Sequence, residues 1–204
     1  MIKLKNLLGI FVGKRPVESI ANDNISLKEG LLNYAVPFLL VMVLLSIEAV
    51  FFRIGSGLFS GEDLVAMFIG LVILVIGLLF AIPLSFIVQV VAIYVLGAVM
   101  FLVGGIYRKE RGGMNDFNGA LLTLFASVVL FVGLLSLIPI IGWIAAIVAK
   151  IYAIVLIYNF VRARFNLSDS QSAIIVLIPV DLIMAFVLII ATAISFFLIG
   201  SRVL

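Results

Sequence analysis

The sequence predicts an all-α polytopic membrane protein, a five-span helical bundle with a cytoplasmic N-terminus and an external C-terminus. Of its 204 residues, 66% are hydrophobic and 11% are charged, whereas soluble domains carry about 25% charged residues. The mean hydropathy is +1.44. Apolar runs of about 20 residues recur along the chain, as a bilayer core about 30 Å thick requires of helices that cross it. These observations exclude a soluble fold.

The residue types present exclude several kinds of active site. The chain has neither cysteine nor histidine, so it has no thiol nucleophile, no disulfide, no imidazole base and no zinc site built from those ligands. A serine hydrolase would lack its histidine base. A membrane di-aspartate protease would need two mid-span aspartates, and only Asp181 lies mid-span. No phosphate-binding glycine motif occurs. We therefore expect no enzymatic activity, no cofactor and no metal.

Residues 1–30 are expected to form an N-terminal amphipathic segment at the membrane interface. Apolar residues such as Leu7 alternate there with four cations, which are Lys3, Lys5, Lys14 and Arg15. Such a helix can lie among the lipid headgroups, with its lysines close to anionic lipids. The alternative interpretation is a frayed basic tail.

Residues 31–204 are expected to form the transmembrane domain. Capping patterns that begin at Ser26, Ser60 and Ser168 predict where helices start. The Gly-Ser-Gly sequence that follows Arg53 predicts a turn after the first span. The five spans are expected at about residues 31–52, 64–104, 117–137, 140–160 and 172–199.

The apolar run 64–104 is the ambiguous element, because a straight helix of that length would measure about 60 Å. It could form a hairpin that turns near Pro83, or one kinked or tilted crossing. Cytoplasmic connections of membrane proteins are enriched in Lys and Arg. The N-terminal segment, the loop around Arg108 and the loop around Arg162 are all basic. These three segments can lie on the same side of the membrane only if residues 64–104 cross it once. We therefore predict five spans.

Several short motifs resemble the Yip (Ypt-interacting protein) domain family in its prokaryotic form. They are residues 15–20 (RPVESI), 26–31 (SLKEGL), 112–117 (GGMNDF), 139–143 (PIIGW) and 161–172 leading to Pro179. The resemblance implies five spans with a cytoplasmic N-terminus. It also implies a role in membrane organisation, since eukaryotic relatives bind prenylated small GTPases and act in vesicle traffic. The Asp-Leu-Tyr-Gly-Pro motif of those relatives is absent before the first span, so small-GTPase binding is not carried over to this chain.

Ionisable residues within the spans are candidates for an intramembrane site. A charge at the centre of a bilayer costs roughly 2.5–3.5 kcal/mol on insertion scales, so such residues usually have partners. Lys150 and Asp181 lie at similar depths in consecutive antiparallel spans and are a candidate charge pair. The pair would either fix the register of two helices or line a cleft for an ion, a proton or a lipid headgroup. Ser85 and Gln89, one turn apart, are candidates for interhelical hydrogen bonds.

The cytoplasmic loops are the candidate docking surface. Their cations could contact anionic lipid or protein partners, and they are Arg108, Lys109, Arg111, Arg162 and Arg164. The expected function is a non-enzymatic integral membrane scaffold or adaptor. The alternative is a small ion- or solute-translocating protein that uses Lys150 and Asp181. The expected partners are the lipid bilayer, proteins at these loops and a second copy of the chain, but no nucleic acid. The expected location is a prokaryotic plasma membrane.

Overall fold

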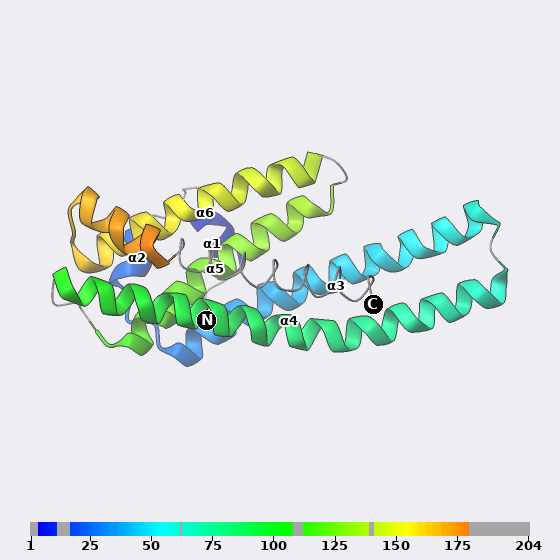
Figure 1. Ribbon diagram of the computed structural model, residues 1–204, viewed down its shortest axis with the longest axis horizontal. Helices are drawn as coiled ribbons and strands as arrows, with labels where there is room; N and C mark the ends of the chain where they lie inside the picture. Colours follow the sequence, from blue (N-terminus) through cyan, green and yellow to red (C-terminus); the bar gives the residue numbers. More distant parts are fainter. Residues whose placement is uncertain (1–3, 12–16, 62, 108–111, 139–140, 180–204) are drawn as a thin grey trace, which may run out of the picture.

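The computed structural model describes residues 4–11, 17–61, 63–107, 112–138 and 141–179, and these are helical apart from short turns (Figure 1). The helices are α1 (Leu4–Phe11), α2 (Val17–Asn22), α3 (Leu27–Ser60), α4 (Leu64–Tyr107), α5 (Met114–Ser136) and α6 (Ile141–Phe165). A further helix begins at Asp169 and continues through residue 179. Within the described ranges no strand occurs.

Three of the described helices, α3, α4 and α5, are long and apolar enough to cross a membrane. The other two predicted spans correspond to α6 and to the segment that starts with the helix at 169–179. The five-span count therefore stays a prediction, and most of its last span lies outside the described residues. The all-helical character and three candidate membrane helices are established by the structure.

Helix α3 begins where the capping pattern places it but ends later than predicted. The Ser26 side chain accepts a hydrogen bond from the backbone N–H of Glu29 at 3.3 Å. The helix then passes through the Gly-Ser-Gly sequence and ends at Ser60, whereas the sequence predicted a span ending at residue 52 and a turn directly after it. Gly61 ends it, with a φ of 66° and its N–H bonded to the Gly57 carbonyl. The left-handed conformation favours glycine at this position.

Helix α4 is one continuous helix of 44 residues with Pro83 inside it (Figure 1). The alternative of a hairpin turning near Pro83 is therefore wrong, because the backbone from Leu64 to Tyr107 stays helical. At 1.5 Å per residue the helix is about 66 Å long, against about 34 Å for the 23 residues of α5. Helices α3 and α4 consequently extend beyond the far end of α5 and α6 as a hairpin (Figure 1).

The four long helices alternate in direction, so the molecule has two distinct ends. At one end α3 begins, α4 ends, α5 begins and α6 ends, and we call it the basic end (Figure 1). The other end, where α3 and α4 are joined at residues 60–64, we call the hairpin end. Because α4 runs once from the hairpin end to the basic end, the connections before α3, between α4 and α5 and after α6 all meet at the basic end.

Helices α3 and α5 pack closely because glycines face each other at their contact. A Cβ added to Gly30 would coincide with the backbone of Gly119, and one added to Gly119 would strike the carbonyl oxygen of Ile25. About three turns further along α3 and about four turns further along α5, Val41 fills the space above Gly133. Small residues of this kind let membrane helices approach to backbone contact.

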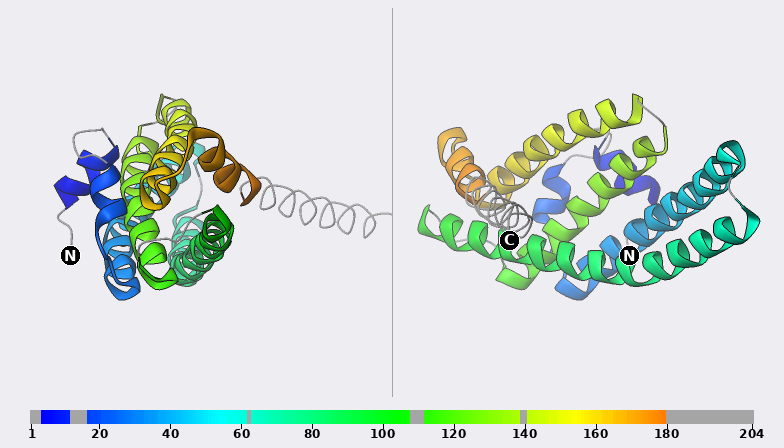
Figure 2. Two further views of the ribbon diagram at one scale, coloured as in Figure 1. Left: turned by 90° about the vertical axis from the view of Figure 1, so that its left-hand side faces the viewer. Right: turned by 45° about the vertical axis from the view of Figure 1, so that its right-hand side comes forward.

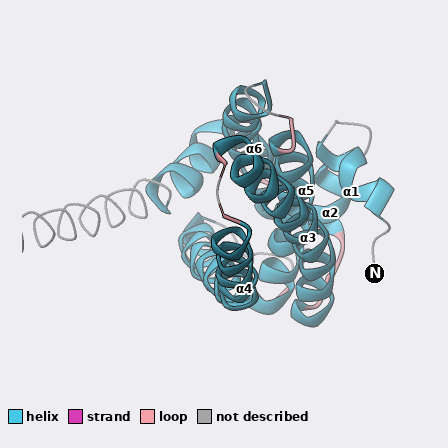
Figure 3. Ribbon diagram, turned by 90° about the vertical axis from the view of Figure 1, so that its right-hand side faces the viewer, coloured by secondary structure: helices cyan, strands magenta, loops and turns pink. Residues whose placement is uncertain are grey.

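The short N-terminal helices pack on the bundle on the side opposite α4 (Figures 2 and 3). Helix α1 contacts α5, and α2 contacts α6 and α5. Leu7, which belongs to the apolar side of the predicted interfacial helix, is buried in the protein together with Ile10. In α2 the buried residues are Val17, Ile20 and Ala21. An interfacial location for residues 1–30 stays a prediction, but this apolar side is covered by protein.

The glycine contact between α3 and α5 generates a direct test. Gly119→Ala should lower the free energy of unfolding by about 1–3 kcal/mol, because the added methyl group must push α3 away. The matched control is Gly77→Ala in α4, where nothing lies within 4 Å of the added Cβ. It should be neutral or stabilise by up to about 1 kcal/mol through helix propensity. Reversible unfolding in mixed detergent micelles measures both, and equal effects of the two changes would contradict the proposed packing.

Candidate functional site

A buried hydrogen bond joins α3 to α5 directly beside the glycine contact. The Asn33 side-chain amide donates to the Thr123 hydroxyl at 3.1 Å, and that hydroxyl donates to the Gly119 carbonyl at 3.0 Å. Both side chains are buried, with 2% of Asn33 and none of Thr123 exposed. The sequence analysis did not single out this pair. In the sequence, the pair is marked only by the fact that each residue is polar within an otherwise apolar helix.

A second polar contact joins α3 to α4. The Tyr34 hydroxyl donates to the Gln89 side-chain oxygen at 2.6 Å, and the Gln89 amide donates to Ser85 at 3.0 Å. Of the two residues singled out in the sequence, Gln89 therefore reaches the neighbouring helix, whereas Ser85 contacts Gln89 within α4. The rings of Tyr34, Phe38 and Phe86 pack around this contact, with centroids 5.3–6.0 Å apart. The contact ties the two helices together near the middle of α4.

Asn118 of α5 is a further interior polar residue, and it faces α4. Its side chain is fully buried, and neither of its polar atoms has a hydrogen-bond partner among the described residues. A Cβ added to Gly97 of α4 would clash with its side-chain oxygen, so Gly97 provides the space that this amide occupies. The sequence analysis missed Asn118, which follows Phe117 at the predicted start of the third span.

Arg164 is buried at the basic end and is not a surface cation. Only 4% of it is exposed, and its guanidinium donates to the carbonyl of Ala21 at 2.7 Å and to that of Asp23 at 3.3 Å. It thereby binds the end of α2 to the last turn of α6. A Cβ added to Gly112, whose φ is 96°, would lie 2.7 Å from this guanidinium. The expectation that Arg164 contacts lipid or protein partners is therefore corrected, because its donors point into the protein.

Arg162, two residues earlier, lies on the surface. It forms an ion pair with Asp169 at 2.9 Å, and its side chain is 52% exposed. The Tyr158 hydroxyl donates to the same carboxylate at 3.1 Å. These contacts hold the end of α6 against the start of the following helix, where the backbone N–H of Ser168 also donates to the Gln171 side chain at 3.3 Å. Arg162 remains accessible to a partner.

The structure does not describe the side chains of the other predicted site residues. Arg108, Lys109, Arg111 and Asp181 lie outside the described residues, and the description of Lys150 is confined to its backbone in α6. The candidate pair of Lys150 and Asp181 therefore stays a prediction. Within the part of the chain that the structure describes, no three acidic side chains cluster in a way that could hold a metal ion.

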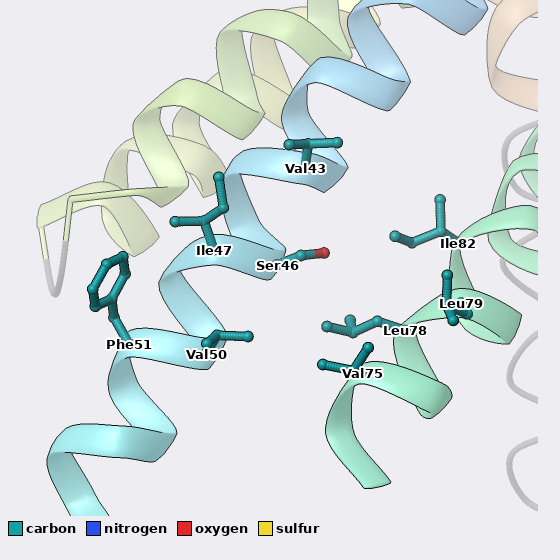
Figure 4. A pocket seen from close by; sticks show the side chains of 9 residues that line it. All are labelled: Val43, Ser46, Ile47, Val50, Phe51, Val75, Leu78, Leu79 and Ile82. Carbon is teal, nitrogen blue, oxygen red and sulfur yellow. The ribbon is translucent and has the colours of Figure 1, made fainter. Parts of the chain in front are cut away.

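The apolar grooves on the surface of the described helices include the following two. The larger, of about 420 Å³, lies between α3 and α4 near the hairpin end, and we call it the hairpin groove (Figure 4). Its walls include Val43, Ile47 and Val50 from α3 and Val75, Leu78 and Leu79 from α4. The smaller, of about 400 Å³, lies between α6 and the helix at 169–179.

The described arrangement can bind apolar groups and hold helices together. The bonds from Asn33 to Thr123 and from Tyr34 to Gln89 join neighbouring helices, and none of these four residues lines either groove. The lining of both grooves is almost wholly apolar. These hydrogen bonds thus serve helix packing, and the grooves and the basic end are surfaces open to lipid or to a partner.

Comparison with known proteins identifies the family. Residues 28–193 match the model of the Yip1 domain, from the first turn of α3 to beyond the described residues. No curated protein and no solved structure gives a match. The family model covers most of the chain and agrees with the resemblance found in its short motifs. This protein belongs to the Yip1 domain family.

Proposed function

We propose that this protein is a non-enzymatic integral membrane scaffold whose basic end lies at the cytoplasmic face and binds lipid headgroups and partner proteins. The observation that carries the proposal is the location of the basic connections. The start of α3, the end of α4, the start of α5 and the last turn of α6 lie at one end of the bundle. Lys28 and Arg162 belong to these ends, and Arg108, Lys109 and Arg111 follow the last residue of α4 in the sequence. Arg53 is the only cation between Lys28 and Arg108.

This distribution of charge supports a cytoplasmic basic end. Positively charged connections are retained on the cytoplasmic side of a membrane. Three separate basic segments share one side only if α4 crosses the bilayer once, and the continuous helix provides that path. The complete proposed topology has α3, α4, α5 and α6 as the first four spans and residues 172–199 as the fifth. The membrane would be the plasma membrane of a prokaryote.

The length of α4 would be accommodated by tilt, by a bend near Pro83 and by projection of its ends into the headgroup regions. Its length of about 66 Å is roughly twice the thickness of the hydrocarbon core, and helices that exceed that thickness tilt or kink. Pro83 lies near the middle of α4 and removes one backbone hydrogen bond there. The hairpin formed by α3 and α4 would thus lie obliquely in the bilayer, beside the shorter α5 and α6.

The interior contacts favour a scaffold over a translocating protein. A translocation path needs polar groups that face a shared cavity, whereas Asn33 donates to Thr123 and Tyr34 donates to Gln89 at the contacts between helices. Interhelical hydrogen bonds in membranes contribute about 0.6 kcal/mol on average. Their effect is to fix which helices are neighbours. This role suits a protein that presents a stable surface to its partners.

The two arginines near the end of α6 should respond differently to neutralisation. Arg164→Gln should lower the free energy of unfolding by about 1.5–3 kcal/mol, because it removes charge-assisted hydrogen bonds to buried carbonyls. Arg162→Gln should cost less than about 1 kcal/mol, since it breaks an exposed ion pair. Unfolding in micelles measures both changes. A larger loss for Arg162→Gln than for Arg164→Gln would show that these roles are reversed.

The scaffold itself is tested by photocrosslinking in the native membrane. A photoreactive amino acid placed at Ser170, an exposed serine at the basic end, should reproducibly capture one protein partner. The matched site at the hairpin end is Ser60, also an exposed serine, and it should not capture that partner. Neutralising Arg108, Lys109, Arg111 and Arg162 together to glutamine should weaken the capture at Ser170.

The translocation alternative predicts a different pair of results. Ser170 would then capture only lipid or a second copy of the chain. The protein in sealed vesicles would conduct ions or protons, and Lys150→Met with Asp181→Asn would abolish this flux. Both results together would refute the scaffold. Under the scaffold proposal, the same double change leaves the capture of the partner intact.

A further inference from the structure

The hairpin groove is closed at both ends by contacts between its two helices. On the side toward the basic end, Phe38 of α3 packs against Phe86 of α4 with ring centroids 5.3 Å apart. Toward the hairpin end, the Arg53 side chain lies across α4 at Gly70, where an added Cβ would be 2.5 Å from its guanidinium. Between these two contacts the helices stand apart and leave a space of about 420 Å³ (Figure 4). The space is thus a bounded slot.

The chemistry of the slot suits a hydrocarbon chain. Its walls are aliphatic and aromatic except for Ser46, and the Ser46 hydroxyl donates to the Met42 carbonyl of its own helix at 2.7 Å. Figure 4 shows Val50 of α3 facing Val75 and Leu78 of α4 across the gap. No wall residue offers an unsatisfied polar side chain, so a polar solute would lose its hydration without gaining hydrogen bonds. An apolar chain has no hydrogen bonds to lose on entering.

Arg53 places a cation at one end of this apolar slot. Glycine at position 70 allows the guanidinium to lie against the backbone of α4. Arg53 already takes part in an interaction within the protein, and its five N–H donors allow it to hold a phosphate oxygen as well. The acidic residues Glu48 and Asp63 are exposed near the same end. A headgroup that carries both a phosphate and an ammonium group therefore matches this end better than an anionic headgroup.

We propose that the hairpin groove is a binding site for a zwitterionic phospholipid. One acyl chain lies between α3 and α4, and the phosphate is held by Arg53 at the hairpin end. The lipid fills the gap between the two helices and stabilises the part of the hairpin that extends beyond α5 and α6. This site is at the opposite end from the basic end and does not depend on the scaffold function proposed above.

The test uses the full chain in vesicles that contain phosphatidylethanolamine with a photoreactive group on one acyl chain. After irradiation, labels should concentrate in the peptides 43–51 and 75–82. Val75→Trp should abolish this excess labelling, because the larger ring fills the slot. The matched control is Val91→Trp, an exposed valine of the same helix outside the groove, and it should change nothing. Thermal unfolding of both variants checks that the fold is intact.

The headgroup contact is tested separately. Arg53→Gln should reduce labelling of the same peptides roughly tenfold, as expected when one charge-assisted hydrogen bond is lost, and Arg53→Lys should retain part of it. The same photoreactive chain on phosphatidylglycerol should label the groove more weakly. Stronger labelling with phosphatidylglycerol would overturn the assignment of a zwitterionic headgroup.

Other occupants would give distinct results. Because the chain contains no cysteine, Val50→Cys introduces a single thiol into the groove. Disulfide-linked dimers of this variant would identify a second copy as the occupant. Crosslinking of this thiol to residues 180–204 with a bifunctional reagent would identify the chain's own C-terminal segment. Either result would overturn the lipid site, as would equal labelling of the groove and of the surface around Val91.

Discussion

The backbone contact between Gly30 and Gly119 is the constraint on which the rest of the structure depends. It brings α3 and α5 together side by side and in the same direction, and the bond between Asn33 and Thr123 fixes their register one turn further along. In a bilayer the hydrophobic effect does not drive helices together, so packing and polar contacts must do so. With α3 and α5 in place, α4 and α6 run antiparallel to them. The two short N-terminal helices cover the remaining side.

The same arrangement explains why the two ends of the molecule differ. Alternating helix directions gather the basic connections at one end, while the long α3 and α4 extend past their neighbours at the other. At the basic end Arg164 is buried and hydrogen-bonded to the end of α2, whereas Arg162 lies on the surface. At the hairpin end the two helices separate around an apolar slot. The proposed partner surface and the proposed lipid site are therefore separated by the length of the bundle.

The sequence predicted the features that depend on local composition. Hydropathy indicated a helical membrane protein, the Ser26 pattern located the start of α3, and short motifs indicated the Yip family that the family model confirms. It failed at the end of α3 and where a residue's role depends on a distant partner. The end of α3 was placed at residue 52, whereas the helix continues through the Gly-Ser-Gly sequence to Ser60. Arg164 was taken for a surface cation, because its burial depends on carbonyls about 140 residues away.

The central claim is that α4 crosses the membrane once, which places the basic connections together on the cytoplasmic side. Since the chain has no cysteine, single-cysteine variants can be labelled in intact cells with a membrane-impermeant thiol reagent. Ser60→Cys at the hairpin end should react from outside. Gly113→Cys and Ser170→Cys at the basic end should react only after the membrane is opened. Reaction of Ser60→Cys and Gly113→Cys from the same side would contradict the account, because α4 would then not cross the bilayer.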